Sequence, residues 1–112
     1  MIKTKSFQFA VAVAGCCRGL IEHREYVLSK QLLRSGTSIG ANVREAINAS
    51  SRKDFAYKLG VALRECDETA FWLELLSESH YITQSQFNEL NAQAQELMRI
   101  LTSILKTTRQ NL

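Results

Sequence analysis

Proline is absent from this chain of 112 residues, and only five glycines occur. Because these two residues most often interrupt helices and form tight turns, their scarcity favours long, uninterrupted helices. No window shows the sustained alternation of β-branched and polar residues that marks a half-buried strand. The sequence therefore offers no support for strands and predicts an all-α fold.

Long apolar runs are also missing. No segment approaches the roughly 20 consecutive apolar residues that cross a bilayer, and the opening residues lack the apolar stretch of a secretory signal. The three cysteines are the adjacent Cys16 and Cys17 and a distant Cys66, a spacing that suits neither a disulfide framework nor a zinc site. We therefore expect a cytoplasmic protein without membrane association, in which Cys16 and Cys66 are small core residues.

Catalytic and metal-binding patterns are equally scarce. Helical bundles that hold two metal ions use Glu-x-x-His pairs, but Leu20 stands three residues before His23 and Ser77 stands three before His80. No glycine-rich loop is followed by the Lys-Ser/Thr of a phosphate-binding loop. Cys17 has a basic neighbour, but no base and orienting group can be identified for it. We predict no metal, no cofactor and no enzymatic activity.

Four segments carry helical apolar periodicity, at about residues 3–22, 25–48, 51–79 and 83–109. Ser51 with Asp54 and Thr83 with Gln86 have the spacing of helix starts, in which the first side chain caps the helix. The short connections place successive helices antiparallel. We predict one domain over residues 1–112, folded as an antiparallel up-and-down four-helix bundle.

The predicted helix at 25–48 has chemically distinct faces. Its core-facing arc consists of Leu32, Ser35, Ile39, Val43 and Ala46. One flank carries Gly36 and Gly40, which allow another helix to approach closely. The other flank consists of Ser38, Asn42 and Glu45. Lys30, Arg34 and Arg44 lie opposite the core and form a basic stripe.

The basic stripe is the candidate nucleic-acid-binding feature. Fourteen basic and eleven acidic residues give a net charge of +3, with the basic excess concentrated near the N-terminus. The predicted phosphate contacts are Lys30, Arg34 and Arg44, aided by Lys3, Lys5 and Arg24. No aromatic residue interleaves with the stripe, so backbone electrostatics would dominate over base stacking. An ordinary solvated helix face explains the same pattern, and both interpretations stay open.

Two of the predicted helices, 3–22 and 51–79, carry a second apolar face that a monomeric bundle does not need. The outer residues are Phe7, Val11, Tyr57, Val61, Trp72 and Leu75, with Glu68 among them. They are either scattered surface residues or one patch on adjacent helices that a second subunit covers. We predict a subunit interface. A carboxylate at Glu68 then needs an arginine, either Arg64 or one from a neighbouring subunit.

Two runs of the sequence, residues 31–45 and 63–76, resemble the bacterial four-helix-bundle family named after proteins encoded in intervening sequences of 23S rRNA genes. The Ser-Ile-x-x-Asn-x-x-Glu run at 38–45 and the Glu-x-x-Glu-Thr run at 65–69 carry the resemblance, which covers about residues 5–105. The resemblance implies the four-helix fold and transfers no catalytic residue.

The same family includes the accessory variability protein of diversity-generating retroelements, a basic homopentameric barrel that binds nucleic acid and a reverse transcriptase. The resemblance therefore implies a ring of bundles, with a homopentamer favoured. The leading hypothesis is a non-enzymatic, oligomeric, RNA-associated protein. The alternative is a protein-interaction scaffold, or a reverse-transcriptase accessory subunit, without RNA binding of its own.

Overall fold

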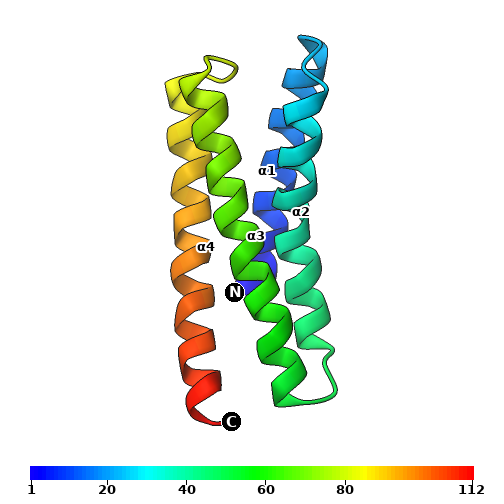
Figure 1. The fold of residues 1–112 in the computed structure, drawn as a ribbon, viewed down its shortest axis with the longest axis vertical. Coiled ribbons are helices and arrows are strands. Elements are labelled where there is room, and N and C mark those ends of the chain that lie inside the picture. The colour runs from blue at the N-terminus through cyan, green and yellow to red at the C-terminus, as the bar shows by residue number, and fades with distance from the viewer.

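The computed structural model describes residues 1–112 as four helices and no strand. They are α1 (Ile2–Glu22), α2 (Val27–Ile47), α3 (Arg52–Glu78) and α4 (Gln84–Gln110). Successive helices run antiparallel (Figure 1). Each helix packs on the next, α4 also meets α1, and the backbones of the diagonal pairs α1/α3 and α2/α4 nowhere approach to a Cα–Cα distance of 8 Å. The predicted all-α up-and-down four-helix bundle is confirmed, and none of its helices is long and apolar enough to cross a membrane.

Side-chain caps fix the starts of the last two helices. The Ser51 hydroxyl accepts a hydrogen bond from the Asp54 amide at 3.0 Å. At α4 the Thr83 hydroxyl accepts from the Gln86 amide at 3.1 Å, and the Gln86 side chain accepts from the Thr83 amide at 2.8 Å. This reciprocal pair is a capping box, which satisfies two donors that a helix start otherwise leaves unpaired.

The start of α2 differs from the sequence-based prediction. The Glu25 carboxylate accepts hydrogen bonds from the amides of Leu28, at 2.6 Å, and Ser29, at 3.1 Å. Glu25 thereby caps α2 from outside the helix, which begins at Val27. The preceding residue, Arg24, has a positive φ of 64° and reverses the chain. Periodicity alone places Glu25 inside the helix because capping by a glutamate has no strong sequence pattern.

The core runs the length of the bundle and contains the five predicted α2 residues, all buried. On α1 the buried residues are Ser6, Phe9, Val13, Cys17 and Leu20. Cys17 is 2% exposed, whereas Cys16 is half-buried, so the prediction of Cys16 as the core residue was wrong. The Cys17 thiol donates to the carbonyl oxygen of Ser29 at 3.3 Å, which ties the end of α1 to the start of α2.

Close packing of α1 on α2 depends on the glycine flank. A Cβ atom placed on Gly36 would lie 2.7 Å from Val13 Cγ1, and one on Gly40 would lie 3.4 Å from the backbone oxygen of Ser6. Val13 is fully buried and β-branched, so its methyl groups cannot rotate away freely. The expectation that these glycines admit another helix is therefore correct, and the helix is α1.

Gly36→Ala is expected to destabilise the bundle by about 1–2 kcal/mol. Alanine gains up to about 1 kcal/mol of helix propensity, but overpacking against Val13 costs about 1–3 kcal/mol. Gly15→Ala is the matched control, because a Cβ there meets no atom within 4 Å. That variant should gain about 0.5–1 kcal/mol. Urea denaturation measures the free energy of unfolding of both variants, which should fall in Gly36→Ala and rise in Gly15→Ala. A stabilised Gly36→Ala protein would contradict the close contact between Gly36 and Val13.

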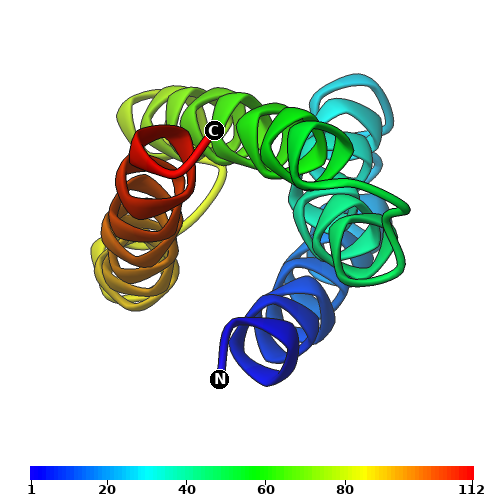
Figure 2. The same cartoon turned by 90° about the horizontal axis from the view of Figure 1, so that it is seen from below.

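Seen from below, the four helices form an arc with α1 and α4 at its two ends (Figure 2). The principal extents are 46 × 20 × 19 Å. Because α1 is shorter than α3 and α4, its first turn reaches the middle of α4, where Ile2 lines a hollow with Ile100 and Ile104. Beyond this level α1 is absent, and the bundle consists of the end of α2, the α2–α3 turn, the start of α3 and the C-terminal half of α4 (Figure 1).

Candidate nucleic-acid interface

Basic and acidic residues separate along the 46 Å axis of the bundle. Residues 1–6, 43–64 and 96–112, which include the α2–α3 turn and the C-terminus, are called the basic end here. Its basic residues are Lys3, Lys5, Arg44, Arg52, Lys53, Lys58, Arg64, Arg99, Lys106 and Arg109. Its acidic residues are Glu45, Asp54 and Glu96. The other half, the acidic end, contains the remaining eight acidic and four basic residues. A modest net charge of +3 therefore conceals a strongly polarised molecule.

A groove between α1 and α2 opens on the basic end. Its volume is about 310 Å³, and its lining consists of Lys3, Ser6, Phe7, Ala10, Thr37, Gly40, Ala41 and Arg44. The Arg44 guanidinium lies 5.5 Å from the centre of the Phe7 ring, a cation–π distance. The ring remains 54% exposed. The groove thus combines two cations and an accessible aromatic face, and no carboxylate lines it.

The structure distributes the six predicted phosphate contacts over four places. Lys3 and Arg44 meet at the groove, as described. Arg24 and Lys30 lie at the acidic end, near the α1–α2 turn. Lys5 pairs with Glu96 of α4 at 3.1 Å, and Arg34 is engaged by carboxylates of α3. The predicted stripe is therefore interrupted at Arg34. The sequence of one helix does not show which neighbouring helix supplies the carboxylates that pair with its cations.

The expectation that no aromatic residue interleaves with the stripe holds on α2 itself, but Phe7 of α1 lies beside Arg44. Phe7 comes from α1, not from the helix that carries Arg44, and only the packing of the two helices brings them together. A partial signal exists in the sequence, because Lys3 and Phe7 are spaced by one helical turn on α1. That spacing does not identify Arg44 as the third member.

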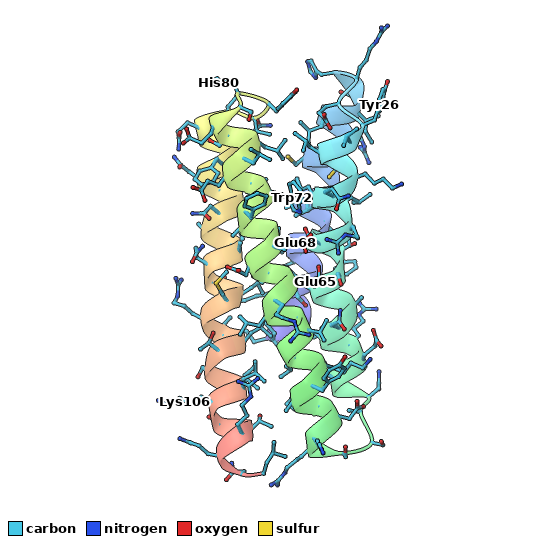
Figure 3. The ribbon with its side chains drawn as sticks, in the orientation of Figure 1. Tyr26, Glu65, Glu68, Trp72, His80 and Lys106 are labelled. Carbon is cyan, nitrogen blue, oxygen red and sulfur yellow. The ribbon has the colours of Figure 1, made fainter.

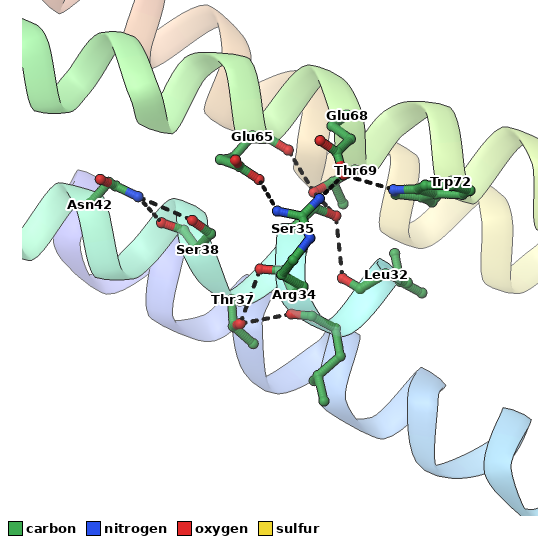
Figure 4. A network of polar contacts seen from close by, with 11 residues as sticks. Leu32, Arg34, Ser35, Thr37, Ser38, Asn42, Glu65, Glu68, Thr69 and Trp72 are labelled. Atoms are coloured by element: carbon green, nitrogen blue, oxygen red, sulfur yellow. Dashed lines mark hydrogen bonds and ion pairs between the residues drawn. The ribbon is translucent and has the colours of Figure 1, made fainter. Parts of the chain in front are cut away.

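Arg34 links α2 to α3 (Figure 4). Its Nη1 atom lies 3.1 Å from Glu65 Oε2, and its Nη2 atom contacts Glu68 Oε2. The same Glu68 oxygen accepts a hydrogen bond from Trp72 Nε1 at 3.0 Å. The arginine that meets Glu68 is therefore Arg34 of the same chain, and the predicted partners, Arg64 or a neighbouring subunit, were wrong.

A second, buried layer of hydrogen bonds lies beneath this ion pair (Figure 4). The Thr69 hydroxyl lies 2.9 Å from the Ser35 hydroxyl and 2.7 Å from the carbonyl oxygen of Glu65. Both hydroxyl-bearing side chains are fully buried, so these contacts satisfy groups that would otherwise destabilise the interface. Further along α2, Asn42 donates to Ser38, and Glu45 pairs with Lys58 of α3 at 3.1 Å. The runs 31–45 and 63–76, which resemble the family, thus meet at the α2–α3 interface through Arg34 and Ser35.

The seven predicted interface residues do not form one patch. Phe7, Val11 and Tyr57 are 54, 57 and 62% exposed. The other four, Val61, Glu68, Trp72 and Leu75, are half-buried within the chain. The prediction that α1 and α3 are adjacent was wrong, because the two helices lie diagonally and their Cα atoms are nowhere within 8 Å of each other. The exposed apolar residues therefore belong to two separate faces, and Phe71, 56% exposed beside Trp72, was missed on the α3 face.

Burial raises the pKa of all three cysteine thiols. Desolvation raises the pKa of Cys17 to about 12, with a smaller contribution from Cys16, and raises the pKa of Cys66 to about 12, with a smaller contribution from Asp67. Desolvation also raises the pKa of Cys16. All three thiols are protonated at neutral pH, the form that is a poor nucleophile. No group of three His, Cys, Asp or Glu side chains is arranged to hold a metal ion.

The fold and the charge distribution define a small four-helix-bundle protein with one basic end. Its α2 and α3 are joined by the polar contacts of Arg34 with Glu65 and Glu68 and of Ser35 with Thr69, called the polar lock here. The family model described as 23S rRNA-intervening sequence protein matches residues 1–103, and the chain belongs to this family. The resemblance inferred from the two sequence runs is confirmed.

Among solved structures, the chain is similar to a protein of unknown function from the S23 ribosomal protein family of Bacteroides thetaiotaomicron, determined as a crystal structure at 1.70 Å resolution. The two share 50% sequence identity and superpose with a TM-score of 0.93. The match covers 95% of this chain and 99% of the other. None of the curated proteins matches the chain.

Proposed function

We propose that this protein is a non-enzymatic RNA-associated protein that contacts the phosphate backbone through its basic end. The observation that carries the proposal is the groove between α1 and α2, where Lys3 and Arg44 face solvent with no carboxylate beside them. The concentration of basic residues in the same half of the molecule gives a positive field that attracts a polyanion. The family description, which refers to 23S rRNA, agrees with an RNA ligand.

The chemistry of the groove favours binding that tolerates many sequences. The Arg44 guanidinium presents a planar fork that matches phosphate oxygens, and Lys3 acts as a mobile point charge. The exposed face of Phe7 offers a surface on which any base can stack, since every base has an aromatic face. Nothing in the groove reads a particular base edge, so backbone contacts dominate.

Replacing both groove cations tests the proposal. The variant with Lys3→Gln and Arg44→Gln should bind structured RNA about tenfold more weakly, because two phosphate contacts are lost. The matched control carries Arg24→Gln and Lys30→Gln, which removes the same charge from exposed residues at the acidic end. Fluorescence anisotropy with labelled RNA measures both affinities. An equal loss in both variants would show that only total charge matters and would contradict a site in the groove.

The oligomeric state forms part of the proposal. Val11 on α1 and Tyr57 and Phe71 on α3 are exposed apolar residues on diagonally placed helices. Two different patches on one subunit suit head-to-tail contacts, which close into a ring when the rotation permits. We therefore propose a homo-oligomeric ring, with the homopentamer that the family resemblance implies.

Native mass spectrometry of the wild-type protein tests the ring directly. The expected result is one closed oligomer that dissociates when Tyr57 and Phe71 are both replaced by serine. A monomer at micromolar concentration would contradict it. Should the protein bind no RNA, the same two faces favour the scaffold function, in which a protein such as a reverse transcriptase is the partner.

A further inference from the structure

The C-terminal half of α4 presents a polar face that carries three cations. Its side chains are Gln95, Arg99, Thr102, Ser103, Lys106 and Gln110, with Arg109 at the edge. These positions recur every three to four residues and so share one side of the helix. Figure 3 shows Lys106 near the lower end of α4, at the end of the bundle where the C-terminus lies. No carboxylate lines the hollows beside these side chains.

The three cations have no internal partner. The ion pairs of the molecule involve Lys5, Arg34 and Lys58 as cations, and none involves Arg99, Lys106 or Arg109. All three are exposed. Shallow hollows of about 430 and 500 Å³ flank them and are lined by the hydroxyls of Thr102 and Ser103 and the amides of Gln95 and Gln110. Hydroxyls and amides beside unpaired cations are the groups that contact phosphate oxygens.

Packing on α3 keeps one of these cations in place. Gly60 of α3 is buried, and a Cβ atom built there would lie 3.7 Å from the Arg109 guanidinium. The arginine therefore extends along α3 where that helix has no side chain. Leu63 of α3 and Leu105 of α4 line the same hollow as Arg109 and Lys106. The apolar stems of the two cations lie against this floor while their charges remain in solvent.

The α4 face lies near the groove between α1 and α2. Arg99 shares a hollow of about 510 Å³ with Ile2 of α1, and the next residue on α1 is Lys3, which lines the groove. Cations therefore succeed one another around the basic end, from Arg44 on α2 through Lys3 on α1 to Arg99 on α4. The cross-section of the bundle is 20 × 19 Å, so a flexible strand can follow this path.

From this arrangement we infer that the outer face of α4, with Arg99, Lys106 and Arg109, is a second phosphodiester-binding face. It rests on the proposed function, since its ligand is the same RNA, which extends from the α1–α2 groove onto α4. No aromatic side chain lines the face, so its contacts are to phosphates and sugars and carry no sequence preference.

The test compares two triple variants of the full chain. One carries Arg99→Gln, Lys106→Gln and Arg109→Gln. The matched control carries Arg18→Gln, Arg24→Gln and Lys30→Gln, three exposed and unpaired cations of the acidic end. Circular dichroism establishes that both are folded. The affinity for a long single-stranded RNA is then measured between about 50 and 200 mM salt.

Loss of three phosphate contacts should lower the slope of log affinity against log salt by about 2 in the α4 variant, because each contact to a single strand contributes about 0.7. The control slope should stay near that of the wild type. An α4 variant with the wild-type slope would overturn the second face, while the groove variant, Lys3→Gln with Arg44→Gln, would still test the proposed function. A wild-type protein that binds no RNA at low salt would overturn both.

Discussion

Replacing Arg34 with glutamate is expected to destabilise the bundle by about 1–2 kcal/mol, because the variant places three carboxylates together where Arg34, whose side chain is 49% exposed, now pairs with two. Glu65 and Glu68 both contact Arg34, and their side chains are only 20 and 37% exposed. Water therefore screens their repulsion less than on an open surface. The substitution also removes the cation that holds the Glu68 carboxylate in place. The same carboxylate accepts the hydrogen bond from Trp72 Nε1.

Urea denaturation of three variants isolates this interaction. Lys30→Glu is the control, because Lys30 stands one turn earlier on α2, is exposed and has no ion pair, so its reversal should change stability by less than about 0.5 kcal/mol. Arg34→Glu combined with Glu68→Arg exchanges the charges and should recover part of the loss. If Arg34→Glu costs no more than Lys30→Glu, the polar lock between α2 and α3 contributes nothing to stability.

Stability is expected to fall steeply above pH 9, because two buried thiols resist ionisation in the folded state. Their ordinary pKa is 9.0, whereas burial raises the pKa of Cys17 and of Cys66 to about 12. Because the pKa of each thiol is higher in the folded state, the thiols of the unfolded chain lose their protons at a lower pH than those of the folded chain. The stabilisation is therefore complete below pH 9 and is lost progressively as the pH rises toward 12. Each thiol lowers the free energy of unfolding by about 1.4 kcal/mol per pH unit in that window.

Thermal or urea unfolding at several pH values between 8 and about 11 measures this slope. The double variant with Cys17→Ala and Cys66→Ala is less stable at neutral pH because it loses buried atoms, but its stability should depend much less on pH. All other ionisable groups are common to the two proteins, so their contributions cancel in the comparison. If the free energy of unfolding depends on pH in the same way in both proteins, the thiols ionise as readily in the folded state as in the unfolded one, which would contradict the prediction.

The elements and their faces could be predicted from the sequence wherever a local rule governs them. The starts of α3 and α4 follow from Ser51 and Thr83, whose caps involve residues three positions on. The buried arc of α2 follows from helical periodicity, and the close packing at Gly36 follows from the missing side chain. In each case the information lies within a few residues of the feature.

The candidate site could be predicted only in part, because its geometry depends on which helices become neighbours. A helical wheel places Lys30, Arg34 and Arg44 on one face, but α3 brings two carboxylates to Arg34, and α1 brings Phe7 to Arg44. The outer apolar residues were grouped as one patch for the same reason, although α1 and α3 are diagonal. The cations of α4 were not singled out, since only the assembled bundle shows them to be unpaired and near the groove.

The affinity of the wild-type protein for structured RNA, measured across salt concentration, tests the phosphate-binding proposal most directly. Binding through the basic end predicts tight binding near 50 mM salt and a linear fall of log affinity with log salt, steep enough that several phosphates must be neutralised. No binding at low salt, or binding that salt does not weaken, would contradict a phosphate-binding basic end.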